Sequence, residues 1–261
     1  RERRRVELED KNHLEEKGVN LILNDGVKKL IGENKVKAVS TEKDKSIASD
    51  LVLVSVGIKP EVQLAENAGI RIGETGAITV NNKMETSHPD IYAAGDCAES
   101  TNLVSGKPDW LPLGSTANKQ GRVAGENAAG GNNTHQGILK TAITKIFDLT
   151  VARTGLSVET AKKEGFQVVT TEIEAANHAG YYPGVEKIHL KGIFDRETEK
   201  LLGAEVIGEA GVDKRIDVLS TAIYSELTAH DLFDVDLAYA PPYSSPKDPV
   251  AILGMVAQKS F

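Results

Sequence analysis

The chain has 261 residues, of which 40% are hydrophobic and 26% are charged, so it can bury a sizeable core and is not a disordered tail. Its 31 basic and 38 acidic residues give a net charge of −7, which argues against a general nucleic-acid binder or a polybasic membrane-surface protein. A single cysteine excludes an internal disulfide framework and a zinc site of clustered thiolates, and no apolar run of about 18 residues is present to span a bilayer.

Short elements are predicted along the first fifth of the chain. The charged opening segment, residues 1–18, is typical of a helix tail that is closed by a glycine and has a solvated face. Strands are then predicted over Val19–Leu23, Val27–Ile31 and Lys35–Ser40. The turn at residues 32–34 joins the last two.

A continuous apolar and β-branched run, Leu51–Val56, predicts a strand that is covered on both faces. It ends at Gly57, and Val62–Ala68 then predicts a short helix. A strand that closes in glycine before a loop is where an open α/β sheet places its ligand contacts. We therefore expect this part of the chain to be α/β.

A second short buried strand is predicted over Ile91–Ala94, followed by Gly95 and Asp96. Gly95 would allow a ligand to approach the backbone closely. Asp96 would offer two acceptor oxygens to the hydroxyl groups of that ligand. The alternative is that Asp96 caps the segment that follows it.

A helix of small residues is predicted after Trp110, and such a helix can lie very close to a sheet or a ligand. Its first turn, at Leu113, Gly114 and Ser115, would present unpaired N–H groups and the positive end of the helix dipole. These three residues are therefore predicted to bind a cofactor. The small residues at helical spacing are Ala117, Gly121, Ala124, Gly125 and Ala128.

The last 120 residues predict an α+β domain. The predicted helix over Asp213–Leu227 has one apolar face. An antiparallel sheet with helices on one side would leave a face for self-association, and a twofold dimer is the default symmetry. The predicted strands are Gln167–Ile173, Lys187–Ile193 and Leu201–Ile207.

Two motifs carry a resemblance to a known family. TSHPDIYAAGD followed by LPLGSTANKQGRVAGENAAG resembles the second flavin-binding motif and adjoining helix of the flavoprotein pyridine nucleotide-disulfide oxidoreductases. The ending YAPPYSSPKDPVAILGMVAQ is similar to the dimerisation domain of the branch that holds coenzyme A-disulfide reductase, NADH oxidase and NADH-dependent persulfide reductase.

The resemblance implies a fold of α/β and α+β parts, in which remnants of two Rossmann-like dinucleotide-binding domains precede an α+β dimerisation domain. Residues 1–57 would be the C-terminal remnant of the NAD(P)H-binding domain. Residues 58–140 would be the second segment of the FAD-binding domain. Residues 141–261 would form the dimerisation domain and the homodimer contact.

The function that the resemblance implies is FAD-dependent oxidation of NAD(P)H, with reduction of a coenzyme A disulfide or persulfide through a redox cysteine. The chain has no Gly-x-Gly-x-x-Gly turn, and the family's redox cysteine belongs to an N-terminal half that this chain lacks. We therefore expect a fragment that is inactive alone and binds little or no FAD or NAD(P)H. Cys97 is expected to be a bystander, because a reactive thiol needs a partner that lowers its pKa.

The resemblance also implies roles for single residues. Asp96 would accept a hydrogen bond from the ribityl chain of FAD, and Gly95 would line the same site. Tyr181 and Tyr239 would reach across the dimer, where a phenol can hydrogen-bond a thiolate or donate a proton to a leaving thiol. Asn177 and Lys247 match positions that contact coenzyme A.

Plainer interpretations of these residues stay open. Aromatic residues beside proline are common in interface packing, and Lys247 is equally compatible with a solvated position near a helix start. No metal site is predicted, because the histidines lack ligand spacing.

Alternatives for the function also stay open. One is an NADH oxidase that reduces oxygen, and the other, for this chain alone, is a non-catalytic dimerisation module. The absence of a leader pattern predicts a cytoplasmic protein without nucleic-acid or membrane partners.

Overall fold

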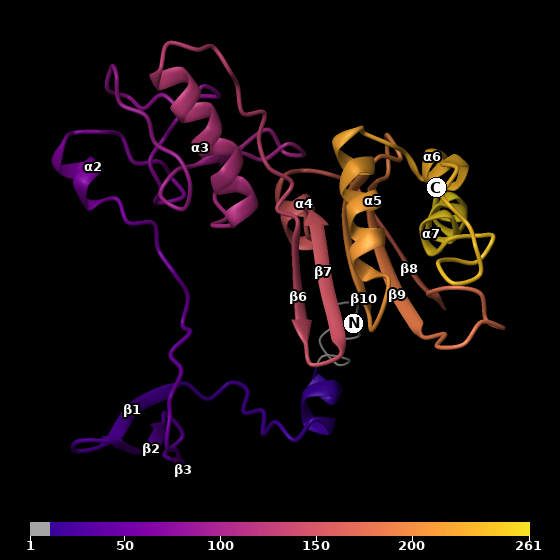
Figure 1. Ribbon diagram of the computed structural model, residues 1–261, viewed down its shortest axis with the longest axis horizontal. Coiled ribbons are helices and arrows are strands. Elements are labelled where there is room, and N and C mark those ends of the chain that lie inside the picture. The colour runs from indigo at the N-terminus through magenta and orange to yellow at the C-terminus, as the bar shows by residue number, and fades with distance from the viewer. Residues whose placement is uncertain (1–10) are drawn as a thin grey trace. The chain divides into compact units, whose positions relative to one another are not determined.

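The computed structural model describes residues 11–261, which form two compact units, one that ends at Lys59 and one from Pro60 to Phe261 (Figure 1). The part of the predicted opening helix at residues 1–10 lies outside the described residues. Residues 11–16 are helical, and Gly18 follows with a φ of 84°, as expected for a glycine that closes a helix.

The first unit contains a three-stranded antiparallel sheet in the order β1-β2-β3. The strands predicted around residues 27–31 and 35–40 are confirmed, and the chain turns between them at residues 33–35. The strand predicted over Val19–Leu23 is wrong, because this segment has no ladder partner among the described residues. The strands are β1 (Val27–Gly32), β2 (Val36–Thr41) and β3 (Ser46–Ala48).

The buried strand predicted over Leu51–Val56 is also wrong. No described strand pairs with this segment, and the side chains of Leu51 and Leu53 are 84% and 88% exposed. An apolar β-branched sequence favours extended backbone, but a strand also needs a neighbouring strand to pair with its N–H and C=O groups.

The second unit begins with a loop-rich segment that packs around helix α2 (Gln63–Asn67), which confirms the predicted helix at this position. The strand predicted over Ile91–Ala94 is wrong: among the described residues, this half-buried segment makes a single isolated bridge, between Glu85 and Tyr92. It is bonded along one edge, since Ala93 N donates to Met84 O at 3.1 Å. The hairpin of β4 (Ser100–Thr101) and β5 (Pro108–Asp109) and the predicted small-residue helix, α3 (Gly114–Ala128), follow.

The rest of the second unit is built on a five-stranded antiparallel sheet in the order β6-β7-β10-β9-β8, which confirms the predicted mixed α/β fold class (Figure 1). The three strands predicted here are confirmed as β8, β9 and β10, whereas the hairpin of β6 and β7 was not predicted. The strands are β6 (Ala142–Ile146), β7 (Leu149–Gly155), β8 (Val168–Ala176), β9 (Lys187–Asp195) and β10 (Leu201–Gly208).

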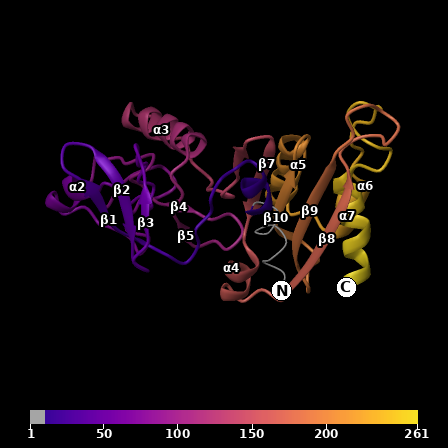
Figure 2. The same cartoon turned by 90° about the horizontal axis from the view of Figure 1, so that it is seen from below.

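Helices cover one face of this sheet. The predicted amphipathic helix is α5 (Val212–Tyr224), which packs on β7 and β10, while α7 (Pro249–Ala257) packs on β8 and β9 (Figure 2). Both helices share one apolar core with the inward-facing strand residues. The short helices are α4 (Val158–Lys163) and α6 (Ala229–Asp234), and the 3₁₀ turn η1 (Gln258–Ser260) ends the chain's last helix.

The other face of the sheet carries charged side chains at its centre, whereas near α4 the apolar Ile193 packs against Ala161. Four strands contribute one row of alternating sign, in which neighbours are paired in register. Opposite charges directly across a strand pair favour this register. The row is Arg153, Glu205, Lys191 and Glu172.

Candidate functional site

The predicted cofactor turn at Gly95 and Asp96 lies against helix α3. Gly95 has a φ of 82°, and a Cβ added there would lie 3.5 Å from the Cβ of Ala117. The positive φ therefore requires glycine, and the helix passes close to the turn. Trp110 Nε1 donates to Asp96 O at 2.9 Å.

Gln120 fixes this arrangement and was not predicted from the sequence. Its buried amide accepts a hydrogen bond from Gly95 N at 2.7 Å. The same side chain donates to Glu99 O at 3.1 Å and to Ser100 Oγ at 2.7 Å. A polar residue in a stripe of small residues was the available signal, because a buried amide needs several hydrogen-bond partners.

The first turn of α3 contains backbone N–H groups that can donate hydrogen bonds to a ligand. Leu113 is the N-cap residue, with extended backbone, and no side chain of the described residues caps the turn. The first helical hydrogen bond is donated by Ala117 N to Leu113 O. The N–H groups of Gly114 and Ser115 thus resemble the free donors at a helix start that suit an oxygen-rich ligand.

Asp96 is exposed, and within residues 11–261 its carboxylate makes no hydrogen bond. It is therefore free to accept hydrogen bonds from ligand hydroxyl groups. The acceptor at Asp96 and the donors at the start of α3 are groups that fit the ribityl chain and ring oxygens of a flavin. The role of these residues in flavin binding remains a prediction.

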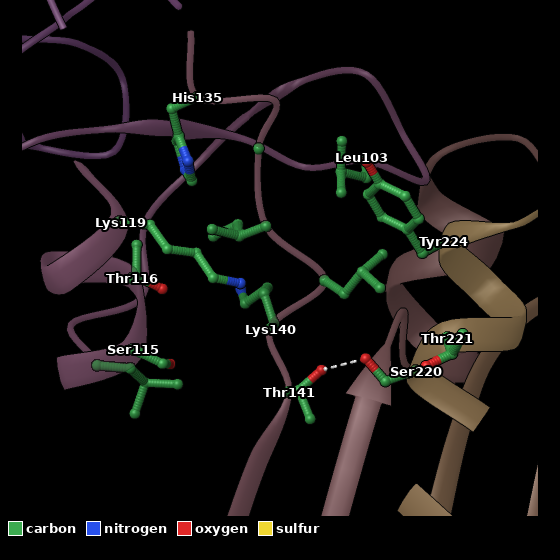
Figure 3. Close-up of a pocket in the computed structure, with 14 residues that line it drawn as sticks. Leu103, Ser115, Thr116, Lys119, His135, Lys140, Thr141, Ser220, Thr221 and Tyr224 are labelled. Carbon is green, nitrogen blue, oxygen red and sulfur yellow. Dashed lines mark hydrogen bonds between the residues drawn. The ribbon is translucent and has the colours of Figure 1, made fainter. Parts of the chain in front are cut away.

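A cavity of about 270 Å³ lies between α3, the segment that leads into β6, and α5 (Figure 3). Leu113 and Ser115 line it, whereas Gly95 and Asp96 do not. The reason is that the turn contacts Ala117 and Gln120, which lie on a different face of α3 from Ser115, Thr116 and Lys119. The predicted cofactor residues are thus divided between two faces of one helix.

The chemistry of the cavity favours an anion. Lys119 and Lys140 line it together with several hydroxyl groups, and none of the described lining residues is an aspartate or a glutamate. Lys140 is paired with Asp109 at 2.8 Å, so Lys119 supplies the less neutralised charge. On the opposite wall, Thr141 and Ser220 share a hydrogen bond of 3.1 Å (Figure 3).

His135 lines the same cavity and is 8% exposed. Its Nε2 is buried without a hydrogen-bond partner among the described residues. Burial, and then the positive charge of Lys119, lower the pKa of His135 below its ordinary value. His135 is therefore held neutral by its surroundings.

Replacing Lys119 by glutamine should raise the pKa of His135, because it removes the positive charge that opposes protonation of the ring. The pKa should stay below the ordinary value, since burial is the larger cause. A proton NMR titration of the histidine ring signals measures this shift. Arg122→Gln, an exposed substitution on the same helix, is the control and should leave the His135 pKa unchanged. If Lys119→Gln and Arg122→Gln shift the His135 pKa equally, the charge of Lys119 is not a specific cause of the lowered pKa.

The two predicted tyrosines, 58 residues apart in sequence, are brought together. Tyr181 lies in the loop between β8 and β9, and Tyr239 lies in the loop between α6 and α7. Their hydroxyl oxygens are 3.5 Å apart, and the side chains are 77% and 48% exposed. The backbones of the loops also join, since Ala179 N donates to Pro241 O at 3.2 Å.

The hydroxyl pair affects ionisation. The hydrogen bond with Tyr181, followed by partial desolvation, raises the pKa of Tyr239 above that of an ordinary tyrosine. A tyrosine phenol is protonated at neutral pH, so Tyr239 can donate a hydrogen bond there, and its raised pKa makes it a weaker acid than an ordinary tyrosine. An exposed phenol in this state suits hydrogen bonding to a thiolate.

The two predicted coenzyme A residues have different surroundings. Asn177 is buried, and its Oδ1 accepts a hydrogen bond from Glu186 N at 3.0 Å, which closes the base of the loop. Lys247 is exposed and directly precedes Asp248, the N-cap of α7. The structure therefore gives Asn177 a role within the fold, and the contacts of both residues with coenzyme A remain predictions.

A buried ion pair behind the tyrosine loops was missed by the sequence analysis. Arg215 of α5 is 1% exposed, and its Nη2 donates to Asp248 Oδ2 at 2.8 Å. Asp248 also accepts from Ser244 Oγ at 2.7 Å and caps α7 through Val250 N. A buried arginine at a helical position facing the apolar core was the signal, because such a charge requires a partner.

Three other features of the described residues favour no particular function. Cys97 is half buried and its thiol lies 3.5 Å from Ala94 O. No group of three or more histidine, cysteine or acidic side chains placed to hold a metal is found among residues 11–261. In the same range, no helix has the length and apolar character needed to cross a membrane.

Comparison with known proteins gives matches over nearly the whole chain. Residues 4–121 match the pyridine nucleotide-disulphide oxidoreductase family, and residues 141–249 match the dimerisation domain of pyridine nucleotide-disulphide oxidoreductases.

Among curated relatives, the NAD(P)H coenzyme A polysulfide/persulfide reductase of Pyrococcus horikoshii is 43% identical over 97% of this chain and 57% of the relative. The coenzyme A disulfide reductase of Staphylococcus haemolyticus is 41% identical over 80% of this chain and 47% of the relative. The chain thus spans about half the length of the curated relatives it matches.

A solved structure of an NAD-dependent persulfide reductase from A. fulgidus superimposes with a TM-score of 0.91 at 46% identity. The superposition covers 95% of this chain and 46% of that one.

Proposed function

Because this chain belongs to the pyridine nucleotide-disulphide oxidoreductase family, we propose that the full-length protein oxidises NAD(P)H and reduces a coenzyme A disulfide or persulfide. FAD, when bound, supplies the electron transfer between the nicotinamide and sulfur. The names of the similar reductases from P. horikoshii and S. haemolyticus support a coenzyme A-linked sulfur substrate.

The observation that carries the proposal is the contact between the hydroxyl groups of Tyr181 and Tyr239 on an exposed surface. These phenols are available to a ligand, and the hydroxyl of Tyr239 carries a proton that it can share in a hydrogen bond. In the proposed reaction Tyr239 donates that proton, or a hydrogen bond, to the sulfur that leaves as coenzyme A thiol. Tyr181 orients the hydroxyl of Tyr239 as it does so.

The remaining residues have binding roles. Asp96 accepts hydrogen bonds from ligand hydroxyl groups, and the N–H groups of Gly114 and Ser115 donate to flavin ring oxygens. Lys247 pairs with a phosphate of coenzyme A as a mobile point charge. The anion-binding character of the cavity at Lys119 is consistent with ligands that carry phosphate groups.

The proposal includes a homodimer formed through residues 141–261, of which residues 141–249 match the family's dimerisation domain. In such a dimer the tyrosine loops of one subunit would serve the flavin of its partner.

Turnover by the purified full-length protein tests this function. NAD(P)H oxidation, followed by absorbance at about 340 nm, should be fast with coenzyme A disulfide or persulfide under nitrogen. Each NAD(P)H oxidised should release two coenzyme A thiols from the disulfide, or one thiol and one sulfide from the persulfide, measured with a chromogenic disulfide added after the reaction is quenched. Absence of flavin absorbance in the full-length protein, or no thiol release, would overturn the proposal.

An NADH oxidase is the second candidate within the family, and the same assay separates it. Turnover that requires oxygen and ignores the sulfur substrate would establish it. The 261-residue chain alone, which lacks both Gly-x-Gly-x-x-Gly turns, serves as the non-catalytic dimerisation module in these experiments. We expect it to dimerise without oxidising NAD(P)H.

A further inference from the structure

The tyrosine pair does not hold itself in place. Both side chains are largely exposed, and a single hydroxyl contact of 3.5 Å connects them. An exposed hydrogen bond between neutral groups competes with water and contributes little. The geometry of the pair must therefore be set by the backbones of the two loops.

Arg215 contacts both loops from below. Its Nη2 donates to Asn177 O, at the start of the Tyr181 loop, at 2.8 Å. The same nitrogen lies 3.3 Å from Tyr243 O, in the Tyr239 loop. One guanidinium thus bonds to carbonyl oxygens of both segments that carry the tyrosines.

The guanidinium is itself fixed on its other sides. Its Nη1 donates to Gly211 O at 3.2 Å, and its Nε and Nη2 face the two carboxylate oxygens of Asp248 at 3.4 and 2.8 Å. Asp248 is the N-cap of α7, and Lys247 precedes it. The planar fork of an arginine can bond to several segments at fixed angles, whereas the point charge of a lysine cannot.

Gly211 makes room for this arrangement. It has a φ of 79°, and a Cβ added there would collide with Arg215 Nη1. The N-terminus of α5 is therefore shaped so that the guanidinium can approach the backbone.

We propose that Arg215 is a positioning residue, which sets the register of the Tyr181 and Tyr239 loops and thereby the contact between the two phenols. It touches neither substrate nor cofactor in this role. The assignment rests on the function proposed above, because that function gives the tyrosine pair its use. It concerns geometry that can be measured in the 261-residue chain without flavin or turnover.

The test is the ionisation of Tyr239, followed by NMR with tyrosine labelled at the ring carbon that bears the hydroxyl. Tyr239→Phe identifies the signal. In the wild-type chain Tyr239 should titrate above an ordinary tyrosine. In Arg215→Lys the pair should separate and the pKa of Tyr239 should fall toward the ordinary value, although the positive charge is kept.

Leu219→Ala is the matched control, because Leu219 is an equally buried residue of the same helix that faces the apolar core. It should destabilise the chain and leave the Tyr239 pKa unchanged. Gly211→Ala is a second variant, which displaces the guanidinium without removing it, and it should shift the Tyr239 pKa in the same direction as Arg215→Lys. If Arg215→Lys does not fold, Gly211→Ala tests the positioning role in its place.

The positioning role is overturned if Tyr239 titrates as an ordinary tyrosine in the wild type, or if folded Arg215→Lys or Gly211→Ala keeps the wild-type value. It is also overturned if Leu219→Ala shifts the pKa equally, since loss of stability alone would then explain the change. None of these results bears on the proposed reductase function, which the turnover assay tests separately. Conversely, if the full-length protein is inactive but the pKa of Tyr239 shifts as expected, the proposed function is wrong and the positioning role of Arg215 stands.

Discussion

Replacing Tyr239 by phenylalanine in the full-length protein should lower the turnover of a coenzyme A disulfide by about 10²-fold, the lower end of the contribution of a positioned general acid, because the raised pKa of Tyr239 lies far above neutral pH. The substitution removes one oxygen and keeps the ring. The leaving sulfur then loses its proton donor, while substrate contacts elsewhere persist. The loss should therefore fall mainly on kcat rather than on KM.

Two measurements check this assignment. Tyr243→Phe is the matched control, because Tyr243 is an exposed tyrosine of the same loop whose backbone oxygen, and not its hydroxyl, contacts Arg215. It should retain turnover within about twofold, as expected when no transition-state contact is lost. In the wild type, activity should decline as pH rises through the raised pKa of Tyr239, because the proton donor is then lost. Full turnover by Tyr239→Phe would exclude the phenol as the proton donor.

Replacing Asp248 by alanine should lower the free energy of unfolding by about 3–5 kcal/mol, because it leaves the buried guanidinium of Arg215 without a counter-charge. The variant also loses the hydrogen bond at 3.0 Å that Asp248 Oδ1 accepts from Val250 N at the start of α7. Urea denaturation of the wild type and the variant measures the difference. Asp236→Ala, at an exposed position, is the control and should change stability by less than about 0.5 kcal/mol.

The same substitution should have a defined pH dependence. Burial opposes ionisation of Asp248, but hydrogen bonds from Val250 N, Arg215 and Ser244, together with the charge of Arg215, outweigh it and lower its pKa below the ordinary 3.8. A carboxylate whose pKa is lower in the folded state stabilises the fold above its unfolded-state pKa. This contribution is lost as pH falls through the folded-state pKa. The difference in free energy of unfolding between wild type and Asp248→Ala should consequently become smaller at acidic pH. A difference that does not change with pH would contradict this account.

Local sequence patterns were enough to predict the family, the strongly patterned elements and the residue types of the site. The small-residue helix after Trp110, the strands at 187–193 and 201–207, and the amphipathic helix after Gly211 follow from periodicity and glycine placement, which act over a few residues. The motif around Gly95 and the ending around Tyr239 identified the family, because unusual residues stand there in a fixed order.

Tertiary structure alone decided which of these residues meet. The apolar run at 51–56 is not a strand, because a strand is completed by its neighbours and not by its own sequence. Two contacts join segments that are far apart in the chain: Tyr181 with Tyr239, and Arg215 with Asp248. Packing also places the turn at Gly95 against one face of α3, while Ser115 lies on another face of that helix. Such contacts depend on the packing of whole elements, and neither periodicity nor spacing along one chain encodes them directly.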